Sequence, residues 1–366
     1  MNSLGLNIIF RMGCICTKEI ITVNSRKYKV CEHLGDGFLC YPKVERSYKT
    51  IHKLKLRKAK KQSSLIYMGK ICFVNLRIFF NSINSGFSTV LLVEEIITHK
   101  KYAIKKITCH GPEDQQLAAK EVEYYKLIKH PNVIECIDST CKGTADLIVN
   151  TTSEMLIVLP YYHKGTLAND LEQRAKNCNY ISPTDILSIF LQICEGVKAF
   201  HEAKPEPLAH RDLKTANIVL SDDGIPIIMD LGSVSTARVQ VCGTQAARTL
   251  QDLAAERCSM PYRAPELFNV ESYCMVDERT DIWSMGCILY ALCYFKSPFD
   301  TVYERGDSVA LAVISAHITF PEDAPYNEDM QNLILMMLKV NPMERPYIYS
   351  VIESVHDTIV KLKHKV

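Results

Sequence analysis

Residues 210–217 read His210-Arg211-Asp212-Leu213-Lys214-Thr215-Ala216-Asn217, and a second acid follows in Met229-Asp230-Leu231-Gly232. The first stretch holds an acid, a lysine two residues later and an amide five residues later. Two carboxylates and an amide on neighbouring loops can accept the proton of a hydroxyl group and coordinate magnesium on a nucleoside triphosphate. Taken singly, each residue is explained as well by a turn, a helix cap or a charged surface. Their order and spacing together favour a catalytic loop followed by a metal-binding loop.

Upstream of these loops the pattern favours β-strands. Residues 86–97 and 101–107 are short β-branched runs that predict two antiparallel strands, and 155–159 is an apolar strand. Between them, 115–128 has helical spacing, which places Leu117, Val122, Tyr125 and Ile128 on one side.

Downstream of residue 180 the pattern becomes helical. Ser182 and Pro183 supply a capping residue and a proline at the first position of a helix whose apolar stripe continues to Phe200. Residues 281–294 are apolar nearly all round, which predicts a buried helix. A strand-rich part followed by a helix-rich part predicts an α+β fold in two lobes.

A strongly basic segment separates the two halves of a glycine-containing hairpin. Leu34-Gly35-Asp36-Gly37 ends one strand and Gly86-Phe87-Ser88-Thr89-Val90 begins the next, and such glycines let backbone amides approach phosphates closely, although an ordinary turn explains them equally well. Residues 38–85 carry eleven Lys or Arg residues and a single acid, Glu45. One interpretation is a basic arm for nucleic acid or acidic lipid. We favour a segment that is looped out of the fold or absent from the mature chain, and we expect no nucleic-acid partner.

The overall composition is that of a soluble globular protein. Of the 366 residues, 47% are hydrophobic and 23% are charged, with a net charge of +2. These values exclude a collagen-like, coiled-coil or wholly disordered chain. Even the apolar residues 71–93 are interrupted by Arg77, so no transmembrane helix is expected. The 15 cysteines are scattered along a chain without a signal-peptide pattern, and we expect them to be reduced.

With these motifs the sequence resembles the eukaryotic protein kinase family over residues 28–360. The resemblance implies a bilobal α+β fold. A small β-rich N-terminal lobe would span 28–160, interrupted by the basic insertion 38–85, and a larger α-helical C-terminal lobe would span 161–360. An N-terminal segment, 1–27, and a C-terminal tail, 361–366, would flank them. The implied reaction is transfer of the γ-phosphate of ATP, with Mg2+, to hydroxyl groups of proteins, including the kinase itself.

The same resemblance assigns roles to individual residues. Lys105, in Tyr102-Ala103-Ile104-Lys105, would hold the α- and β-phosphates, with Glu121 as its ion-pair partner. Asp212 would be the catalytic base, and Lys214 would neutralise the γ-phosphate. Asn217 and Asp230 would bind magnesium. The other ATP-binding residues would be Leu34, Gly35, Gly37, Gly86, Val90 and Ala103.

Further residues are implied to shape the activation segment and to select the acceptor. Glu266 would pair with Arg345, and Asp281 would brace the catalytic loop. Lys214 and Ser259 resemble the residues of serine/threonine kinases rather than tyrosine kinases, because a small hydroxyl near the base leaves room for a short acceptor side chain. The implied enzyme is a non-specific serine/threonine protein kinase.

Two explanations of how the activation segment is held stay open. Arg211 could pair with a phosphate on Ser235, Thr236, Thr244 or Thr249. Alternatively, a helix at 249–257 could pack its apolar side, Leu250, Leu253 and Ala254, on the C-terminal lobe without any phosphate. We favour the second explanation.

The N-terminal residues carry a lipidation pattern. Met12-Gly13-Cys14-Ile15-Cys16-Thr17 fits N-myristoylation of Gly13 if translation starts at Met12. Palmitoylation of Cys14 and Cys16 would add the second signal that stable anchoring requires. Residues 208–233, 249–255 and 277–281 also resemble the myristoylated and palmitoylated serine/threonine kinases. That resemblance implies a cytoplasmic, membrane-associated kinase at perinuclear or Golgi membranes, with a role in secretory-pathway trafficking or signalling.

A second class of function stays open beside the enzyme. A pseudokinase scaffold would keep the fold and bind partners without phosphate transfer. The interrupted glycine hairpin favours it, and the presence of Lys105, Glu121, Asp212, Asn217 and Asp230 favours the enzyme.

Overall fold

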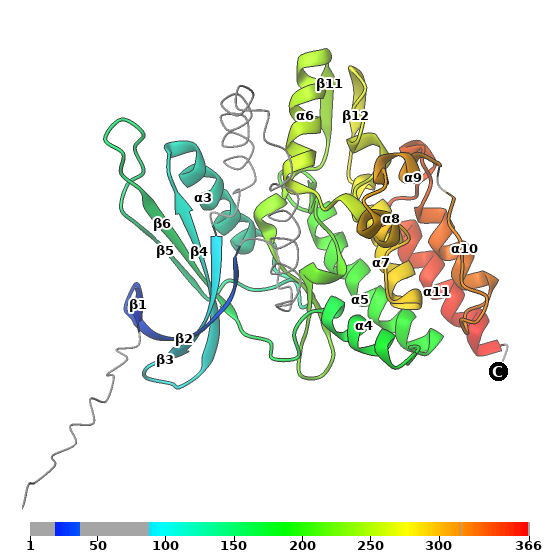
Figure 1. Ribbon diagram of the computed structural model, residues 1–366, viewed down its shortest axis with the longest axis horizontal. Coiled ribbons are helices and arrows are strands. Elements are labelled where there is room, and N and C mark those ends of the chain that lie inside the picture. Colours follow the sequence, from blue (N-terminus) through cyan, green and yellow to red (C-terminus); the bar gives the residue numbers. More distant parts are fainter. Residues whose placement is uncertain (1–18, 37–87, 316, 365–366) are drawn as a thin grey trace, which may run out of the picture.

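The computed structural model describes residues 19–36, 88–315 and 317–364, which form two lobes (Figure 1). The N-terminal lobe is an antiparallel sheet with the strand order β1-β2-β3-β4-β6-β5. Its strands are β1 (Ile20–Val23), β2 (Arg26–Asp36), β3 (Ser88–Glu95), β4 (Lys101–Cys109), β5 (Asp138–Lys142) and β6 (Ser153–Pro160). The predicted antiparallel pair at 86–97 and 101–107 is confirmed as β3 and β4, and the α+β fold class is confirmed with it.

The sheet register brings residues from three strands into one row. Gly35 of β2 lies opposite Val90 of β3, which lies opposite Lys105 of β4. Directly opposed residues project from the same face of an antiparallel sheet. The register therefore places these three residues together although 70 positions separate the first from the last in sequence.

Helix α3 (Pro112–Leu127) packs against this sheet, and most of its predicted apolar side is confirmed. Val122, Tyr125 and Ile128 are buried, whereas Leu117 is 44% exposed. The buried face also contains Ala118 and Glu121, and the Glu121 carboxylate pairs with Lys105. The prediction missed Glu121 because it counted apolar residues alone.

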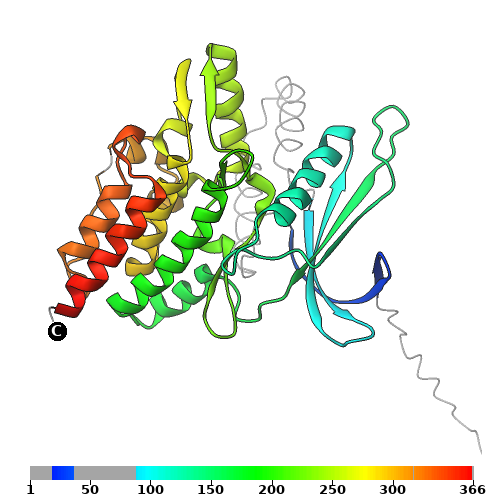
Figure 2. The same cartoon turned by 180° about the vertical axis from the view of Figure 1, so that it is seen from behind.

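The C-terminal lobe is mainly helical (Figure 2). Its helices are α4 (Leu167–Lys176), α5 (Pro183–His201), α6 (Thr244–Arg257), α7 (Arg279–Tyr294), α8 (Asp300–Arg305), α9 (Val309–Ser315), α10 (Glu328–Met337) and α11 (Ile348–His364). Its strands are β7 (Leu208–Ala209), β8 (Ile218–Leu220), β9 (Pro226–Ile228), β10 (Ser235–Thr236), β11 (Val239–Cys242) and β12 (Tyr273–Val276), and its 3-10 turns are η1 (Thr215–Asn217), η2 (Leu231–Ser233), η3 (Met260–Tyr262), η4 (Pro265–Leu267) and η5 (Pro342–Glu344). Helix α6 and the β11–β12 pair stand together on one side of the lobe (Figure 1).

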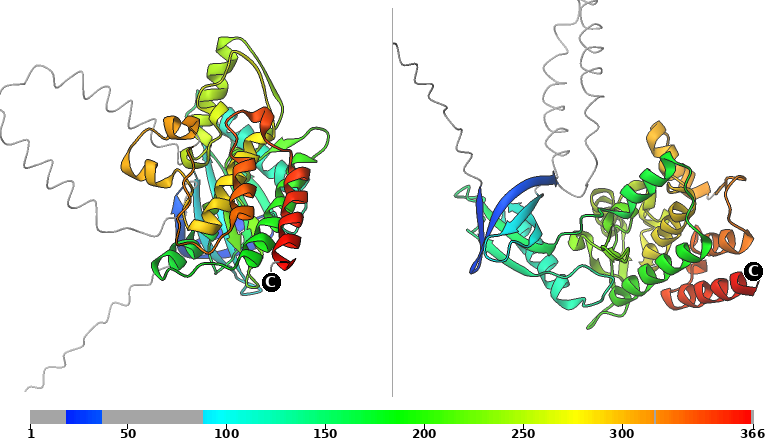
Figure 3. Two further views of the ribbon diagram at one scale, coloured as in Figure 1. Left: turned by 90° about the vertical axis from the view of Figure 1, so that its right-hand side faces the viewer. Right: turned by 90° about the horizontal axis from the view of Figure 1, so that it is seen from below.

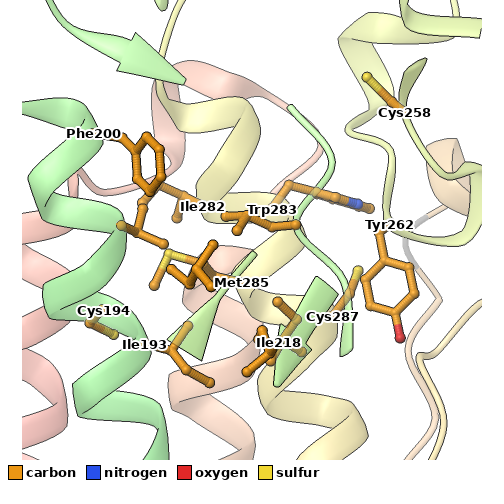
Figure 4. Close-up of a cluster of buried hydrophobic side chains, with 14 of the residues drawn as sticks. Ile193, Cys194, Phe200, Ile218, Cys258, Tyr262, Ile282, Trp283, Met285 and Cys287 are labelled. Carbon is orange, nitrogen blue, oxygen red and sulfur yellow. The ribbon is translucent and has the colours of Figure 1, made fainter. Parts of the chain in front are cut away.

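Helices α5 and α7 form the centre of the larger core. Ser182 caps α5, because its hydroxyl accepts a hydrogen bond from the Asp185 amide at 3.1 Å. Every residue of α7 from Arg279 to Cys293 is buried, as its apolar sequence predicted. Side chains of these two helices, with Ile218 of β8, fill the same space (Figure 4). The loop that contains Asp212 is therefore supported by a closely packed core.

The limits of the structured lobes differ from the expected boundaries. The sheet begins with β1 at Ile20, before residue 28, and α11 continues to His364, beyond residue 360. The insertion 38–85 lies outside the described residues, as do Gly13, Cys14, Cys16, Gly37 and Gly86. The cysteines that the structure describes are all free thiols.

Candidate active site

Asp212 lies at the centre of a hydrogen-bonded loop between β7 and η1. Its Oδ1 accepts a hydrogen bond from the Ser259 amide at 2.8 Å, and its Oδ2 accepts one from Asn217 Nδ2 at 2.9 Å. Lys214 Nζ lies 2.9 Å from the same Oδ2 and donates to Ser259 Oγ at 2.7 Å. Three residues expected at the site, Lys214, Asn217 and Ser259, therefore converge on the Asp212 carboxylate. The two hydrogen-bond donors and the Lys214 ammonium group fix the orientation of this carboxylate.

The backbone of this loop is held from below by Asp281 of α7. Its carboxylate accepts hydrogen bonds from the amides of His210 (2.7 Å) and Arg211 (2.9 Å), and His201 Nε2 lies 3.1 Å away. Burial alone would raise the pKa of Asp281, but the bond and charge of His201 lower it overall. Three such partners stabilise the ionised form of a fully buried carboxylate. The loop is thus fixed before any ligand arrives.

Lys105 joins the N-terminal lobe to the second acidic loop. Its Nζ donates to Glu121 Oε1 and to Asp230 Oδ1, both at 2.8 Å. Burial would lower the pKa of Lys105, but the charges of Asp230 and Glu121 raise it overall. Burial also opposes ionisation of Asp230, yet the Lys105 charge and hydrogen bond lower the pKa of this carboxyl. The pair is therefore ionised in the folded chain.

Asp230 has a backbone conformation that few non-glycine residues adopt. Its φ is +64° and its ψ is +81°, and its side chain accepts a bond from the Gly232 amide at 3.4 Å. Left-handed residues without glycine carry strain and are enriched at functional sites. The next residue, Leu231, is fully buried, and Asp230 Oδ1 also accepts a hydrogen bond from Lys105 at 2.8 Å. The turn therefore directs the carboxylate toward Lys105.

A cleft between the lobes opens beside this ion pair. Of the residues expected to bind ATP, Leu34, Gly35, Val90, Ala103 and Lys105 line it. Glu121 lies behind Lys105, on the wall of a neighbouring cavity. The sequence argument missed other residues of the cleft wall: Ile134, Tyr161, Tyr162, Val219 and Met229. The predicted strand at 155–159 was a usable signal for the tyrosines, since they follow directly where it ends.

The oxygen atoms of Asn217 and Asp230 fit a magnesium site. Asn217 uses its Nδ2 to hold Asp212, while its Oδ1 is buried and has no hydrogen-bond partner. The Asn217 carbonyl accepts from the Met229 amide at 2.9 Å, which brings this residue beside Asp230. A buried amide oxygen without a partner is costly, and Mg2+ prefers carboxylate and carbonyl oxygens. Within the described ranges no cluster of His, Cys, Asp and Glu suggests a different metal site.

The end of the activation segment is fixed by a second ion pair. Arg345 Nη1 and Nη2 donate to the two carboxylate oxygens of Glu266, at 2.8 and 2.5 Å. The Arg345 side chain is completely buried and also donates to the carbonyls of Lys339, Arg279 and Val340. The expected pairing of Glu266 with Arg345 is thus present. This ion pair joins Glu266 to the start of α7 and to the chain that follows α10.

Arg211 is occupied by contacts within the chain. It donates to Thr280 Oγ1 at 2.9 Å and to the carbonyls of Ala237 and Thr236 at 2.6 and 3.5 Å. The expected helix at 249–257 is part of α6, in which Ala247 and Ala254 are buried. Leu250 packs on the core, whereas Leu253 remains 36% exposed, contrary to its expected place on the apolar side. These bonds join Arg211 directly to the backbone of the segment at Thr236 and Ala237.

In the part of the chain that the structure describes, no helix has the length and apolar character needed to span a membrane.

Comparison with known proteins identifies the family. Residues 84–356 match the family described as protein kinase domain. Serine/threonine-protein kinase 16 of Rattus norvegicus and that of Homo sapiens are each 41% identical over 263 residues, which cover 72% of this chain and 83% of those proteins. Serine/threonine-protein kinase ENV7 of Saccharomyces cerevisiae is 26% identical over an alignment of 385 residues, which covers 92% of this chain and 94% of that protein. The chain is a member of the protein kinase family and is a eukaryotic serine/threonine protein kinase similar to serine/threonine-protein kinase 16.

Proposed function

We propose that this kinase transfers the γ-phosphate of Mg·ATP to serine and threonine hydroxyls of other proteins and of itself, with Asp212 as the base. One observation carries the proposal: Lys214, Asn217 and the Ser259 amide converge on the Asp212 carboxylate. Their bonds orient the carboxylate for the proton of an incoming hydroxyl. General bases must lie within hydrogen-bond reach of the proton that they remove, so this fixed orientation supports the role.

The other residues of the site would align the ATP phosphates and neutralise their negative charge. Lys105 would hold the α- and β-phosphates, and Lys214 would sit beside the γ-phosphate that moves. Asn217 Oδ1 and the Asp230 carboxylate would hold magnesium, which supplies positive charge to the β- and γ-phosphate oxygens when bound. In phosphoryl transfer most of the rate enhancement comes from positioning and charge stabilisation.

The small hydroxyl of Ser259 supports a serine or threonine acceptor. Ser259 Oγ is bonded to Lys214, and its amide is bonded to Asp212. This residue therefore forms the wall next to the base while leaving room for a short side chain. A bulkier residue at this position would compete with the acceptor for the same space.

A lipid anchor would bring the kinase to cytoplasmic membrane faces. The pattern from Met12 to Thr17 supports myristoylation of Gly13 and palmitoylation of Cys14 and Cys16 when translation starts at Met12. One myristoyl chain binds membranes only marginally, so the cysteines supply the second attachment. By similarity to the acylated kinases we assign the enzyme to perinuclear or Golgi membranes and to secretory-pathway trafficking or signalling.

Transfer of labelled γ-phosphate from Mg·ATP to a generic protein substrate tests the enzymatic part. Asp230→Asn should abolish transfer, and Asp307→Asn, which changes an exposed acid of the C-terminal lobe, should not. A folded wild-type chain without activity would favour the pseudokinase scaffold. In that case deletion of 38–85 shows whether the insertion is responsible.

Metabolic labelling with myristate and palmitate analogues tests the anchor. Gly13→Ala should abolish the myristoyl label, and Cys14→Ser with Cys16→Ser should abolish the palmitoyl label alone. A chain started at Met12 that takes up neither label would remove the anchor from the proposal and leave the enzymatic part intact.

A further inference from the structure

The loop between β5 and β6 presents three consecutive apolar side chains to solvent. Leu147 is 73% exposed, Ile148 is 96% exposed and Val149 is 68% exposed. A run of exposed apolar residues is unfavourable in water, and such runs mark contact sites. Nothing in the proposed phosphate transfer uses this loop, which lies outside the cleft between the lobes.

The loop is held in shape by its own hydrogen bonds. Asp146 and Thr151 exchange two backbone bonds of 3.0 Å. The Asp146 carboxylate also accepts from the amides of Ile148 and Val149, at 2.7 and 3.3 Å. Because the backbone is already ordered, the apolar tip can bind without a large loss of chain entropy.

A second group of exposed apolar residues lies at the edge strand β1. Ile20 is 58% exposed, and it lies opposite Lys29 of β2. Ile96 and Ile97, in the turn after β3, are 41% and 82% exposed, and the Ile96 amide bonds to the Lys27 carbonyl at 3.0 Å. These isoleucines therefore gather around the β1–β2 hairpin.

Lysines surround the isoleucines of this second group. Lys27, Lys29, Lys100 and Lys101 are all exposed or half-buried. The nearest acid in the same cross-strand row is Glu94, whose carboxylate is engaged by His99 at 2.8 Å. Glu19 and Glu32 are exposed nearby, so the excess of positive charge is modest. Apolar side chains ringed by lysine suit an interface with anionic headgroups.

Both groups lie at the same end of the molecule. Figures 1 and 2 show the β1–β2 hairpin and the β5–β6 loop at the end of the N-terminal lobe farthest from α11, and the right view of Figure 3 shows the same end from below. Asn24 Nδ2, in the β1–β2 turn, donates to Asp138 Oδ1 at 2.7 Å, where β5 begins. The five residues of β5 then span about 17 Å toward the loop. One flat surface can therefore contact both groups.

The short distance in sequence from the lipidation pattern to β1 favours a membrane as the partner of these two apolar groups. Cys16 precedes Glu19 by three residues, and three residues of fully extended chain span at most about 11 Å. An acyl chain on Cys16 would hold β1 within that distance of the headgroups. We infer that the outer end of the N-terminal lobe, formed by Ile20, Ile96, Ile97 and the tip 147–149, rests on an anionic membrane. The inference depends on the proposed acylation for its geometry, and it leaves the C-terminal lobe directed away from the bilayer.

The single tryptophan of the chain makes a direct test feasible. Trp283 is fully buried, so a tryptophan introduced at an exposed position reports its own surroundings against a constant background. We would start the otherwise complete chain at Met12, coexpress it with an N-myristoyltransferase and confirm the modification by mass. The Ile148→Trp variant is mixed with phosphatidylcholine vesicles containing phosphatidylserine, with and without brominated lipid. Leu311→Trp is the matched control, because Leu311 is 69% exposed on α9 in the other lobe.

The expected result is a blue shift and quenching by brominated lipid for Ile148→Trp, with neither for Leu311→Trp. Ile148→Glu should reduce partition into the vesicles about tenfold, since an apolar side chain no longer leaves water. Leu311→Glu should leave partition unchanged, and both glutamate variants should keep wild-type activity on a soluble substrate.

Three outcomes would overturn the inference. They are vesicle-bound protein in which Ile148→Trp is not quenched, myristoylated protein that does not bind even at high vesicle concentration, and loss of Ile148→Glu from cell membranes without lipid quenching, which would indicate a membrane protein as the partner. A chain that is not myristoylated removes the anchor of the proposed function. The unmodified chain at high vesicle concentration then decides: quenching of Ile148→Trp supports the contact surface, and its absence overturns it.

Discussion

The two lobes hold the residues of the proposed active site by different means. In the C-terminal lobe, Asp212 is oriented by bonds from its own and neighbouring loops, and Asp281 fixes the backbone beneath it. In the N-terminal lobe, Lys105 is placed by strand register and by one buried group of three charges. The smaller buried core of that lobe is built around Tyr28 and Ile104.

This difference explains where the fold can accept extra chain. The β2–β3 pairing continues to Asp36 opposite Thr89, directly beside residues 37–87. A strand register depends on the paired residues and not on the length of the connection between them. The loop around Asp212, in contrast, has bonds at nearly every position. An insertion of similar length at 210–217 would break the site.

The largest effect should come from removing the proposed base. Asp212→Asn should lower kcat by roughly 10²–10⁴-fold, because an amide cannot take the proton, while the bond from the Ser259 amide can persist. Steady-state kinetics with circular dichroism as a check of folding would measure this. Asp307→Asn serves again as the control, and activity within tenfold of wild type in the Asp212 variant would assign the proton to another group.

Removing one partner of a buried ion pair should affect the lobes unequally. Glu266→Gln leaves the buried Arg345 guanidinium without its carboxylate and should lower the free energy of unfolding by about 3 kcal/mol. Glu121→Gln should cost less, since Lys105 keeps Asp230 at 2.8 Å. Urea unfolding measures both, and Glu344→Gln, at an exposed acid next to Arg345, is the control. A larger loss of unfolding free energy for Glu121→Gln than for Glu266→Gln would contradict the expected difference between the lobes.

Deleting 38–85 should stabilise the N-terminal lobe. The connection from Asp36 to Ser88 would shorten from 51 residues to three, which lowers the entropy cost of closing it by about 2.5 kcal/mol. Thermal unfolding of the full and deleted chains, with ATP titrations on both, would measure the change. Destabilisation on deletion would mean that the inserted residues contribute contacts to the fold.

The smallest effect should follow phosphatase treatment. Arg211 already donates to Ala237 and Thr280, so it is not free to meet a phosphate on Ser235, Thr236, Thr244 or Thr249. Activity should change less than about twofold. Mass spectrometry must confirm removal of phosphate in the same sample. A tenfold loss of activity after phosphatase treatment would show that the C-terminal lobe needs a phosphate for activity.

Predictions from the sequence were most accurate where the chemistry of the residues and their spacing pointed to the same motif. The motifs around Lys105, Asp212 and Asp230 led to the fold class and to residues that meet within 3 Å in the structure. Short-range signals also located α5 and its Ser182 cap.

Long-range packing was the part that the sequence did not predict. Leu117 is 44% exposed although it lies one helical turn from Glu121, which is buried and pairs with Lys105. The pairing of β11 with β12 was not foreseen, since α6 separates the two strands and no local pattern connects them. Neither was the position of Tyr161 and Tyr162 in the cleft wall, which depends on how the lobes meet.

The bond between Lys105 and Asp230 makes nucleotide entry an exchange of partners. One ammonium group is shared by two carboxylates, and both proposed ligands of Mg·ATP, the lysine and Asp230, are partly engaged with each other. Binding free energy for ATP is then a difference between two ionic arrangements, not a sum of new contacts. In the proposed mechanism, the Asp230 carboxylate would therefore compete with the nucleotide phosphates for Lys105.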